Sequence, residues 1–274
     1  MRLIALTSLF AALLTACMDK EDWGSDSDAA LCGEPTEHPH DPTKPVWSYH
    51  GDTDGPEQWG SLTGYETCGA GSEQSPIDIE RGSVETGTLG LEFKGYDTLI
   101  PLNLVNNGHS LQVNYSGTQS ETDPQITYDN KTWYLIQFHG HADSEHAVDG
   151  DLTTFEWHFV HQATDGTLAV VGVMMDSGDP NANLSALLEH NPGHEMEVSC
   201  DEELSLSDVP VGGAFYHYDG SLTTPSCDQN VNWFVMDLRG TVSDEQAQEW
   251  ITEFGGTTNR PVQPLNDRVV TRYP

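Results

Sequence analysis

From Trp47 onward, the sequence is a series of short apolar runs separated by Gly, Asn, Asp and Pro residues. Only two segments have helical spacing: residues 179–190, and residues 243–254, which open with a Ser-x-x-Gln capping box at Ser243 and Gln246. The runs that read as strands cover residues 111–115, 132–141, 155–163, 168–175 and 231–238. Because strands outnumber helices and are not interleaved with them, the sequence predicts a mostly antiparallel β domain.

The N-terminal residues, MRLIALTSLFAALLTAC, are a predicted targeting segment. Arg2 supplies a positive charge, and the apolar run over residues 3–16 is shorter than the ~20 residues that a membrane span needs. The run ends in Leu-Thr-Ala-Cys17, which resembles the bacterial lipoprotein signal and implies cleavage after residue 16 and a lipid on Cys17. A plain secretory signal is the alternative. Both predict export to the periplasm or the cell surface, where disulfides persist.

Residues 17–44 are polar, acidic and rich in turn-forming residues, with no strong apolar period. This composition predicts a flexible acidic tether between the lipid and the folded part. Residues 45–274 remain as a single folded domain.

The chain is strongly acidic, with 44 acidic residues against 10 basic ones and a formal net charge of −34. This balance argues against a nucleic-acid partner, because phosphate binding needs basic patches. It also leaves the lipid anchor as the expected contact with a membrane. A surface of this kind is typical either of a halotolerant protein, in which salt screens the self-repulsion, or of an ordinary acidic secreted protein.

Once Cys17 is set aside, the cysteines are Cys32, Cys68, Cys200 and Cys227. An even number in an exported chain predicts two disulfides, for which three pairings are possible. None of the cysteines has the CxxC spacing of a structural zinc site, so we do not expect them to bind zinc.

Residues 137–146, QFHGHADSEH, place His139 and His141 two residues apart in a predicted strand, and therefore on one face. A neighbouring strand, FEWHFVHQA, offers His158 or His161, which point to opposite faces because they are three residues apart.

Polar residues two positions before the histidines identify the third ligand. Gln137 precedes His139, and Glu156 precedes His158, so each is placed to accept a ring N–H. This favours His158 over His161. Three neutral imidazoles with one open position are typical of a catalytic zinc, copper or nickel site. The alternative is a group of half-buried strand histidines without a metal.

The segments QFHGHADSEHAVDG and FEWHFVHQ together resemble the zinc-binding region of α-class carbonic anhydrases. The resemblance extends over roughly residues 45–274 and implies a large twisted, mainly antiparallel sheet with short peripheral helices. It also implies one zinc ion per chain and the reversible hydration of CO2 to bicarbonate and a proton. Further matching segments are WSYHGDTDGPEQW (47–59), QSPIDI (74–79), NNGHSLQV (106–113), GSLTTPSC (220–227) and NRPVQPLN (259–266).

The same resemblance implies individual roles. His139, His141 and His158 would be the zinc ligands, and Thr223 would accept a hydrogen bond from the zinc-bound hydroxide that attacks CO2. Glu145 would accept the hydroxyl proton of Thr223. The other implied roles are a proton shuttle (His109), a water network (Tyr49, Asn107, Gln112), an apolar CO2 pocket (Val160, Val170, Leu222, Val231, Trp233), a residue beside the substrate (Thr224) and a disulfide (Cys68–Cys227, with Cys32–Cys200 as a possible second one).

These residue types suit the implied chemistry. Neutral ligands leave the full charge on zinc, which lowers the pKa of its water to about 7, a value known for carbonic anhydrases. A histidine with a pKa near 6.5 relays protons well, although His109 also fits a surface histidine in an Asn-Gly turn. Gly140, between the first two ligands, is smaller than the usual aromatic residue, which predicts looser packing behind the metal.

Two other functions compete with this hypothesis. A carbonic-anhydrase-like binding module without activity usually lacks one or more zinc histidines, whereas this chain has all three. A different zinc hydrolase is disfavoured because the sequence contains no HExxH motif. The oligomeric state is left open, with a dimer as one possibility.

Overall fold

The computed structural model describes residues 32–274. Its strands are β1 (Thr36–Glu37), β2 (Asp78–Ile79), β3 (Glu85–Thr86), β4 (Glu92–Lys94), β5 (Leu99–Asn106), β6 (Leu111–Asn114), β7 (Gln125–Tyr128), β8 (Lys131–His141), β9 (Ala147–Val148), β10 (Phe155–Gln162), β11 (Leu168–Ser177), β12 (Met196–Ser205), β13 (Phe215–Ser221), β14 (Gln229–Met236), β15 (Gly240–Val242) and β16 (Thr271–Tyr273). The helices are α1 (Thr67–Ala70), α2 (Ala182–Glu189) and α3 (Asp244–Glu253), with short 3-10 turns at Trp59–Ser61 and Leu206–Asp208.

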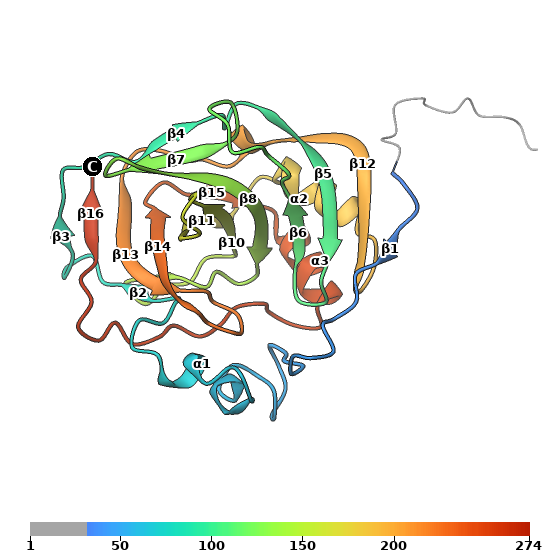
Figure 1. The fold of residues 1–274 in the computed structure, drawn as a ribbon, viewed down its shortest axis with the longest axis horizontal. Helices are drawn as coiled ribbons and strands as arrows, with labels where there is room; N and C mark the ends of the chain where they lie inside the picture. The colour runs from blue at the N-terminus through green and yellow to red at the C-terminus, as the bar shows by residue number, and fades with distance from the viewer. Residues whose placement is uncertain (1–31) are drawn as a thin grey trace, which may run out of the picture.

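A single 14-stranded sheet dominates the molecule, and the short helices lie at its periphery (Figure 1). Its main path runs β1-β12-β5-β6-β8-β10-β11-β14-β13-β16-β3, while β2 and β9 form a small separate sheet. Most neighbouring strands are antiparallel, but β11 pairs in parallel with β14 and β15, and β16 with β3. The predicted mainly β, large-sheet fold is therefore confirmed, and the sheet is mixed.

The two long helices begin where their side chains can cap them. Asn181 accepts a hydrogen bond from the Leu184 N–H at the start of α2. At α3, Ser243 and Gln246 form the predicted capping box. Gln246 also donates to the Asn181 carbonyl at 2.7 Å and accepts from its N–H at 2.9 Å, which joins the two helix starts.

Alternation along β10 separates the core from the polar face of the sheet. Trp157 and Phe159 are fully buried and belong to the main apolar cluster, which also contains Phe138 and Trp250. The intervening His158 and Val160 face the opposite side. Since β8 and β10 pair with His139 opposite His158, the period of two brings histidines from both strands to one face.

Part of the N-terminal segment is attached to the sheet: Thr36 and Glu37 of β1 pair with β12, and Cys32 forms a disulfide with Cys200. The second disulfide joins Cys68 and Cys227, as the resemblance implied. Within residues 32–274 no helix combines the length and apolarity that crossing a membrane demands. The predicted signal segment, residues 1–16, and the predicted lipidation site at Cys17 lie outside the described residues.

Candidate metal centre

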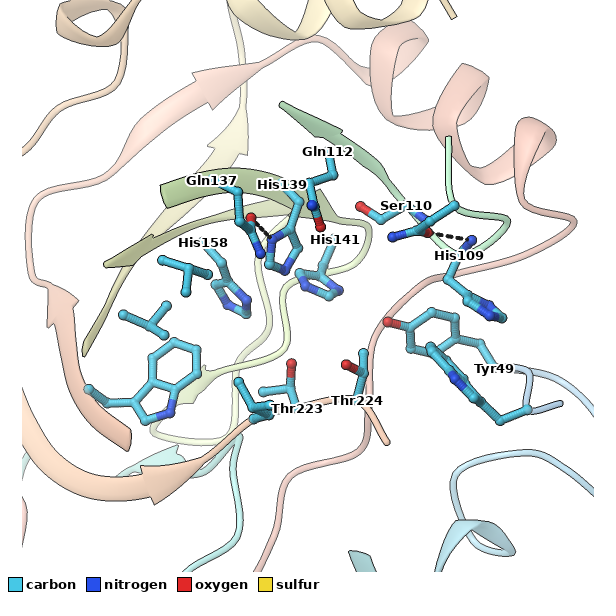
Figure 2. Close-up of a pocket in the computed structure, with 16 residues that line it drawn as sticks. Tyr49, His109, Ser110, Gln112, Gln137, His139, His141, His158, Thr223 and Thr224 are labelled. Atoms are coloured by element: carbon cyan, nitrogen blue, oxygen red, sulfur yellow. Dashed lines mark hydrogen bonds between the residues drawn. The ribbon is translucent and has the colours of Figure 1, made fainter. Parts of the chain in front are cut away.

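A cavity of about 190 Å³ opens over the polar face of β8, β10 and β11. Figure 2 shows three imidazoles on one side, the side chains of Thr223 and Thr224 facing them, and Tyr49 and His109 toward the other end. Fourteen of the predicted site residues line this cavity: Tyr49, Asn107, His109, Gln112, Gln137, His139, His141, His158, Val160, Val170, Leu222, Thr223, Thr224 and Trp233.

The three histidines converge at the floor of the cavity. The ring centroid of His141 lies 5.0 Å from that of His139 and 4.5 Å from that of His158, and His139 and His158 are 5.4 Å apart. One nitrogen of each ring lies within 4.8 Å of the others. This spacing lets one small cation contact all three.

Each ring is oriented by an acceptor behind it. His139 Nδ1 lies 2.7 Å from Gln137 Oε1, and His158 Nε2 lies 3.0 Å from Glu156 Oε1, the partners predicted from strand spacing. His141 Nδ1 instead donates to the Thr258 carbonyl at 2.6 Å, a partner that the sequence did not reveal. The nitrogens that remain, Nε2 of His139 and His141 and Nδ1 of His158, are free to bind a metal.

Glu156 connects this centre to the loop that follows β8. Its carboxylate is fully buried and accepts the backbone N–H of Glu145 at 2.9 Å and that of His146 at 2.8 Å. It also accepts from His146 Nδ1 at 2.7 Å. Burial raises the pKa of Glu156, but the facing rings of His146 and His158 hold it well below its usual range. The carboxylate therefore stays charged.

The three imidazoles fit a divalent cation. Burial lowers the pKa of His141 to about 4, and it lowers the pKa values of His139 and His158 as well, so the rings are neutral at neutral pH. His141 Nε2 is buried and makes no hydrogen bond within the described residues, which is costly unless another partner is supplied. Three imidazoles and no carboxylate ligand match the preference of zinc, copper or nickel.

Glu145 and Thr223 lie beside the imidazoles. Glu145 Oε1 accepts the Arg260 backbone N–H at 2.8 Å, while Oε2 is 3.6 Å from His141 Nε2 and 3.7 Å from His158 Nδ1. Burial raises the pKa of Glu145 to about 7, and the His158 ring and the Thr223 hydroxyl act against this rise. The Glu145 carboxyl thus lies next to both the imidazoles and the Thr223 hydroxyl, the partner that the resemblance implied.

His109 occupies an environment that its sequence position did not predict. Its ring stacks on Trp47, with centroids 3.7 Å apart and planes inclined by 15°. Burial, with smaller contributions from the nearby His194 and His40, lowers the pKa of His109 to about 4. In this conformation of the ring the pKa of His109 therefore lies below the ordinary histidine value of 6.5.

The apolar wall differs from its prediction at one position. Val160, Val170, Leu222 and Trp233 line the cavity, but Val231 does not. Val231 is 2% exposed and packs in the apolar cluster that contains Val160, Val170 and Trp233. It supports the wall and does not form it, because its neighbours cover it.

Packing behind the ligands is not loosened by Gly140. A Cβ at this position would collide with the ring of Phe155, which is fully buried. The aromatic ring that fills this space comes from β10, whereas the resemblance led us to expect it between the ligands on β8. The prediction of loose packing is therefore wrong.

Comparisons with known proteins agree with this geometry. Residues 54–274 match the model of the family described as eukaryotic-type carbonic anhydrase. A curated carbonic anhydrase of Pectobacterium atrosepticum is 34% identical over 229 residues, covering 82% of this chain and 89% of that protein. An α-carbonic anhydrase structure from Thermovibrio ammonificans, in complex with the inhibitor sulfanilamide, is 35% identical and superposes with a TM-score of 0.74 over 82% of this chain and 98% of that one. A structure of dioscorin complexed with ascorbate is 29% identical, with a TM-score of 0.73 over 83% of this chain and 98% of that chain.

Proposed function

This chain belongs to the eukaryotic-type, α-class carbonic anhydrase family of enzymes, and we propose that it binds one zinc ion at His139, His141 and His158 and catalyses the reversible hydration of CO2. The observation that carries this proposal is the convergence of three neutral imidazoles, each oriented from behind, on one cavity. When bound there, a zinc ion supplies a Lewis acid that lowers the pKa of water to about 7, as is known for carbonic anhydrases.

The residues around the histidines determine which molecule reacts and how it is oriented. Val160, Val170, Leu222 and Trp233 offer an apolar surface, which suits CO2 because this substrate needs no hydrogen bonds. Thr223 has a single hydroxyl proton, and Glu145 is the acceptor nearby. Once Thr223 donates to Glu145, its oxygen can only accept, so it selects a partner that has a proton to donate and turns that partner's lone pair toward CO2.

His109 is the proposed route by which protons leave the cavity. It lies in the same cavity as the three imidazoles, at the end where Trp47 and Tyr49 form the wall. Asn107 Oδ1 accepts the backbone N–H groups of His109 and Ser110, both at 2.9 Å, and so fixes the turn that carries the shuttle. The ring takes up a proton more readily when it leaves its stack on Trp47, since burial is the main cause of its low pKa.

Metal removal tests the proposal most directly. We expect about one zinc per chain by atomic absorption, and fast CO2 hydration by stopped flow that a chelator abolishes and added zinc restores. A sulfonamide should block the reaction. A protein with a full complement of zinc and no hydration activity would contradict the enzymatic proposal and favour the binding-module alternative.

Replacement of His109 by alanine should slow turnover mainly in weakly buffered solution. We expect a loss of about 10- to 100-fold, which is at or below the lower limit of the usual contribution of proton-transfer groups, because a pKa near 4 is poorly matched to neutral pH. Added imidazole should restore part of the rate. The exposed His50 provides the control, and its alanine variant should match the parent. Equal rates for the His109 variant and the parent in weak buffer would eliminate the shuttle role.

The alternative function is a catalytically silent binding module. The matched dioscorin structure, which contains ascorbate, supports keeping this alternative because dioscorin is a relative with a bound organic molecule. The complete set of three histidines and their partners favours the enzyme.

We also propose that the mature chain is exported and anchored to a bacterial membrane through a lipid on Cys17. The sequence around Cys17 supports this proposal, as do the two disulfides of the folded part, which persist in oxidising compartments.

A further inference from the structure

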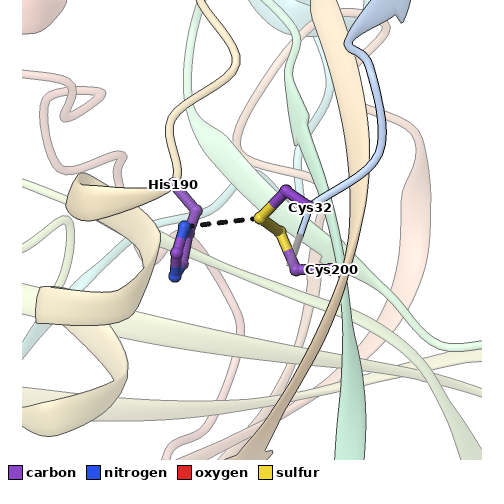
Figure 3. Close-up of side chains that lie close together, drawn as sticks. All are labelled: Cys32, His190 and Cys200. Carbon is purple, nitrogen blue, oxygen red and sulfur yellow. Dashed lines mark hydrogen bonds between the residues drawn. A yellow bond between two sulfur atoms is a disulfide. The ribbon is translucent and has the colours of Figure 1, made fainter. Parts of the chain in front are cut away.

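A second cluster of reactive side chains lies away from the cavity, where the N-terminal segment meets β12 (Figure 3). Cys32 and Cys200 face each other across an isolated antiparallel bridge and form a disulfide. His190, the residue directly after α2, places Nδ1 at 3.4 Å from Cys32 Sγ. The opposite ring nitrogen, Nε2, lies 2.6 Å from Glu202 Oε2.

The Glu202 carboxylate fixes the orientation and the tautomer of the His190 ring. Because Glu202 accepts the proton on Nε2, a neutral His190 ring turns the Nδ1 lone pair toward Cys32 Sγ. A thiol at Cys32 can then pass its proton to Nδ1, which produces a thiolate beside an imidazolium ion. Contacts of this kind with His⁺ are what make a cysteine a good nucleophile and a good leaving group.

The two cysteines of this disulfide differ in exposure. Cys32 is exposed, whereas Cys200 is only 8% exposed. The other disulfide is different: Cys68 is 6% exposed and Cys227 fully buried, and within residues 32–274 neither of its sulfurs has a histidine nitrogen in hydrogen-bond contact. Residues 32–274 therefore contain one enclosed disulfide and one disulfide whose exposed cysteine, Cys32, has an acid–base group beside its sulfur.

We propose that Cys32 and Cys200 form a thiol–disulfide exchange site whose substrates are dithiols, with His190 as the proton-transfer residue and Glu202 as the residue that positions it. A thiolate of the dithiol attacks Cys32 Sγ, the Cys32–Cys200 bond breaks, and Cys200 leaves as a thiolate that takes a proton from water. The second thiol of the dithiol passes its proton to Nδ1 of His190 and attacks the dithiol's own sulfur in the mixed disulfide, so that the bond to Cys32 breaks and Cys32 leaves as a thiolate beside the imidazolium ion. Two electrons pass to the protein, and the dithiol departs as its own disulfide.

Reduction at this site changes how the N-terminal segment is held. With the disulfide intact, residues 32–38 are fixed to β12 by a covalent bond, by the two pairs of β1 and by hydrogen bonds from Gly33 and His38 to Ser199 and Glu195. Without it, the segment keeps hydrogen bonds alone. His40, a few residues further along the chain, lines a pocket together with Trp47 and His109. The segment that the disulfide holds therefore leads directly into residues beside the proposed proton route.

Selective reduction of the full-length protein tests the proposal. The oxidised protein is incubated with dithiothreitol at pH 7, free thiols are trapped with iodoacetamide over time, and peptide mass spectrometry reads each cysteine separately. We expect Cys32 and Cys200 to become labelled at least about 10-fold faster than Cys68 and Cys227, which serve as the internal control. Equal rates for the two disulfides would overturn the proposal.

Variants separate the acid–base role from simple exposure. In the reduced parent, alkylation of Cys32 should titrate clearly below the ~8.5 of a free cysteine, and in H190Q it should return toward that value. Reduction of the disulfide at pH 7 should also slow about 10-fold in H190Q. E202Q, which keeps a hydrogen-bonding amide at the ring, should lie between the two. CO2 hydration verifies that each variant is folded, and an unchanged pH profile and rate in H190Q would overturn the proposal.

Discussion

Replacement of His158 by glutamine should remove the metal and CO2 hydration together. Because His158 supplies one of three converging ring nitrogens, its loss should weaken metal binding by more than the roughly 10- to 100-fold that follows loss of an outer partner alone. Hydration should fall in proportion to the metal lost. The measurements are metal content after dialysis against a weak chelator and stopped-flow hydration on the same samples.

His161 provides a matched control for this experiment. It is fully buried on the same strand but lies on the opposite face, where Nε2 is 2.6 Å from the Tyr96 hydroxyl. Replacement of His161 by glutamine keeps a hydrogen-bonding group there and should leave metal content and activity at neutral pH close to those of the parent. Metal retained in the His158 variant, or lost in both variants, would contradict the assignment of His158 as a ligand.

The His161 variant should also resist acid better than the parent. Burial lowers the pKa of His161 to about 3, whereas an unfolded chain binds this proton near pH 6.5. Between pH 6.5 and pH 3, His161 is protonated in the unfolded state but neutral in the folded state. The free energy of unfolding therefore falls as the pH drops through this range. At pH 5, which is 1.5 units below 6.5, His161 alone lowers the free energy of unfolding of the parent by about 2 kcal/mol.

Urea unfolding at pH 7.5 and pH 5, with chelator present so that metal release does not contribute, measures this effect. Between the two pH values, the parent should lose about 2 kcal/mol more than the His161→Gln variant. The other buried histidines are common to both proteins, so their contributions cancel in the comparison. The exposed His50→Gln variant should behave like the parent. Identical pH dependence in the parent and the His161 variant would show that His161 titrates normally in the folded state.

The sequence predicted the strands whose side chains alternate or are strongly apolar, among them β8, β10 and β11. It did not reveal β12, because Met196–Ser205 carries acidic residues along much of its length. It also missed β5, in which Pro101 interrupts a run with clear alternation of burial. Pairing with neighbouring strands stabilises both segments, and a local pattern does not report that pairing.

The histidines, Gln137 and Glu156 were predictable because strand periodicity places residues two apart on one face. Thr258 was not, because its partner atom is a backbone carbonyl, which every residue has. Periodicity also does not show how close a side chain comes to the cavity. It places Val231 and Trp233 on one face of the sheet, but only Trp233 lines the cavity. The environment of His109 depends on Trp47, a neighbour only in three dimensions.

The carboxylate of Glu156 is shared between the third histidine of the centre and the backbone of Glu145 and His146. Glu156 therefore couples the orientation of the His158 ring to the position of the Glu145 backbone, and a substitution that displaces its two carboxylate oxygens should disturb both together.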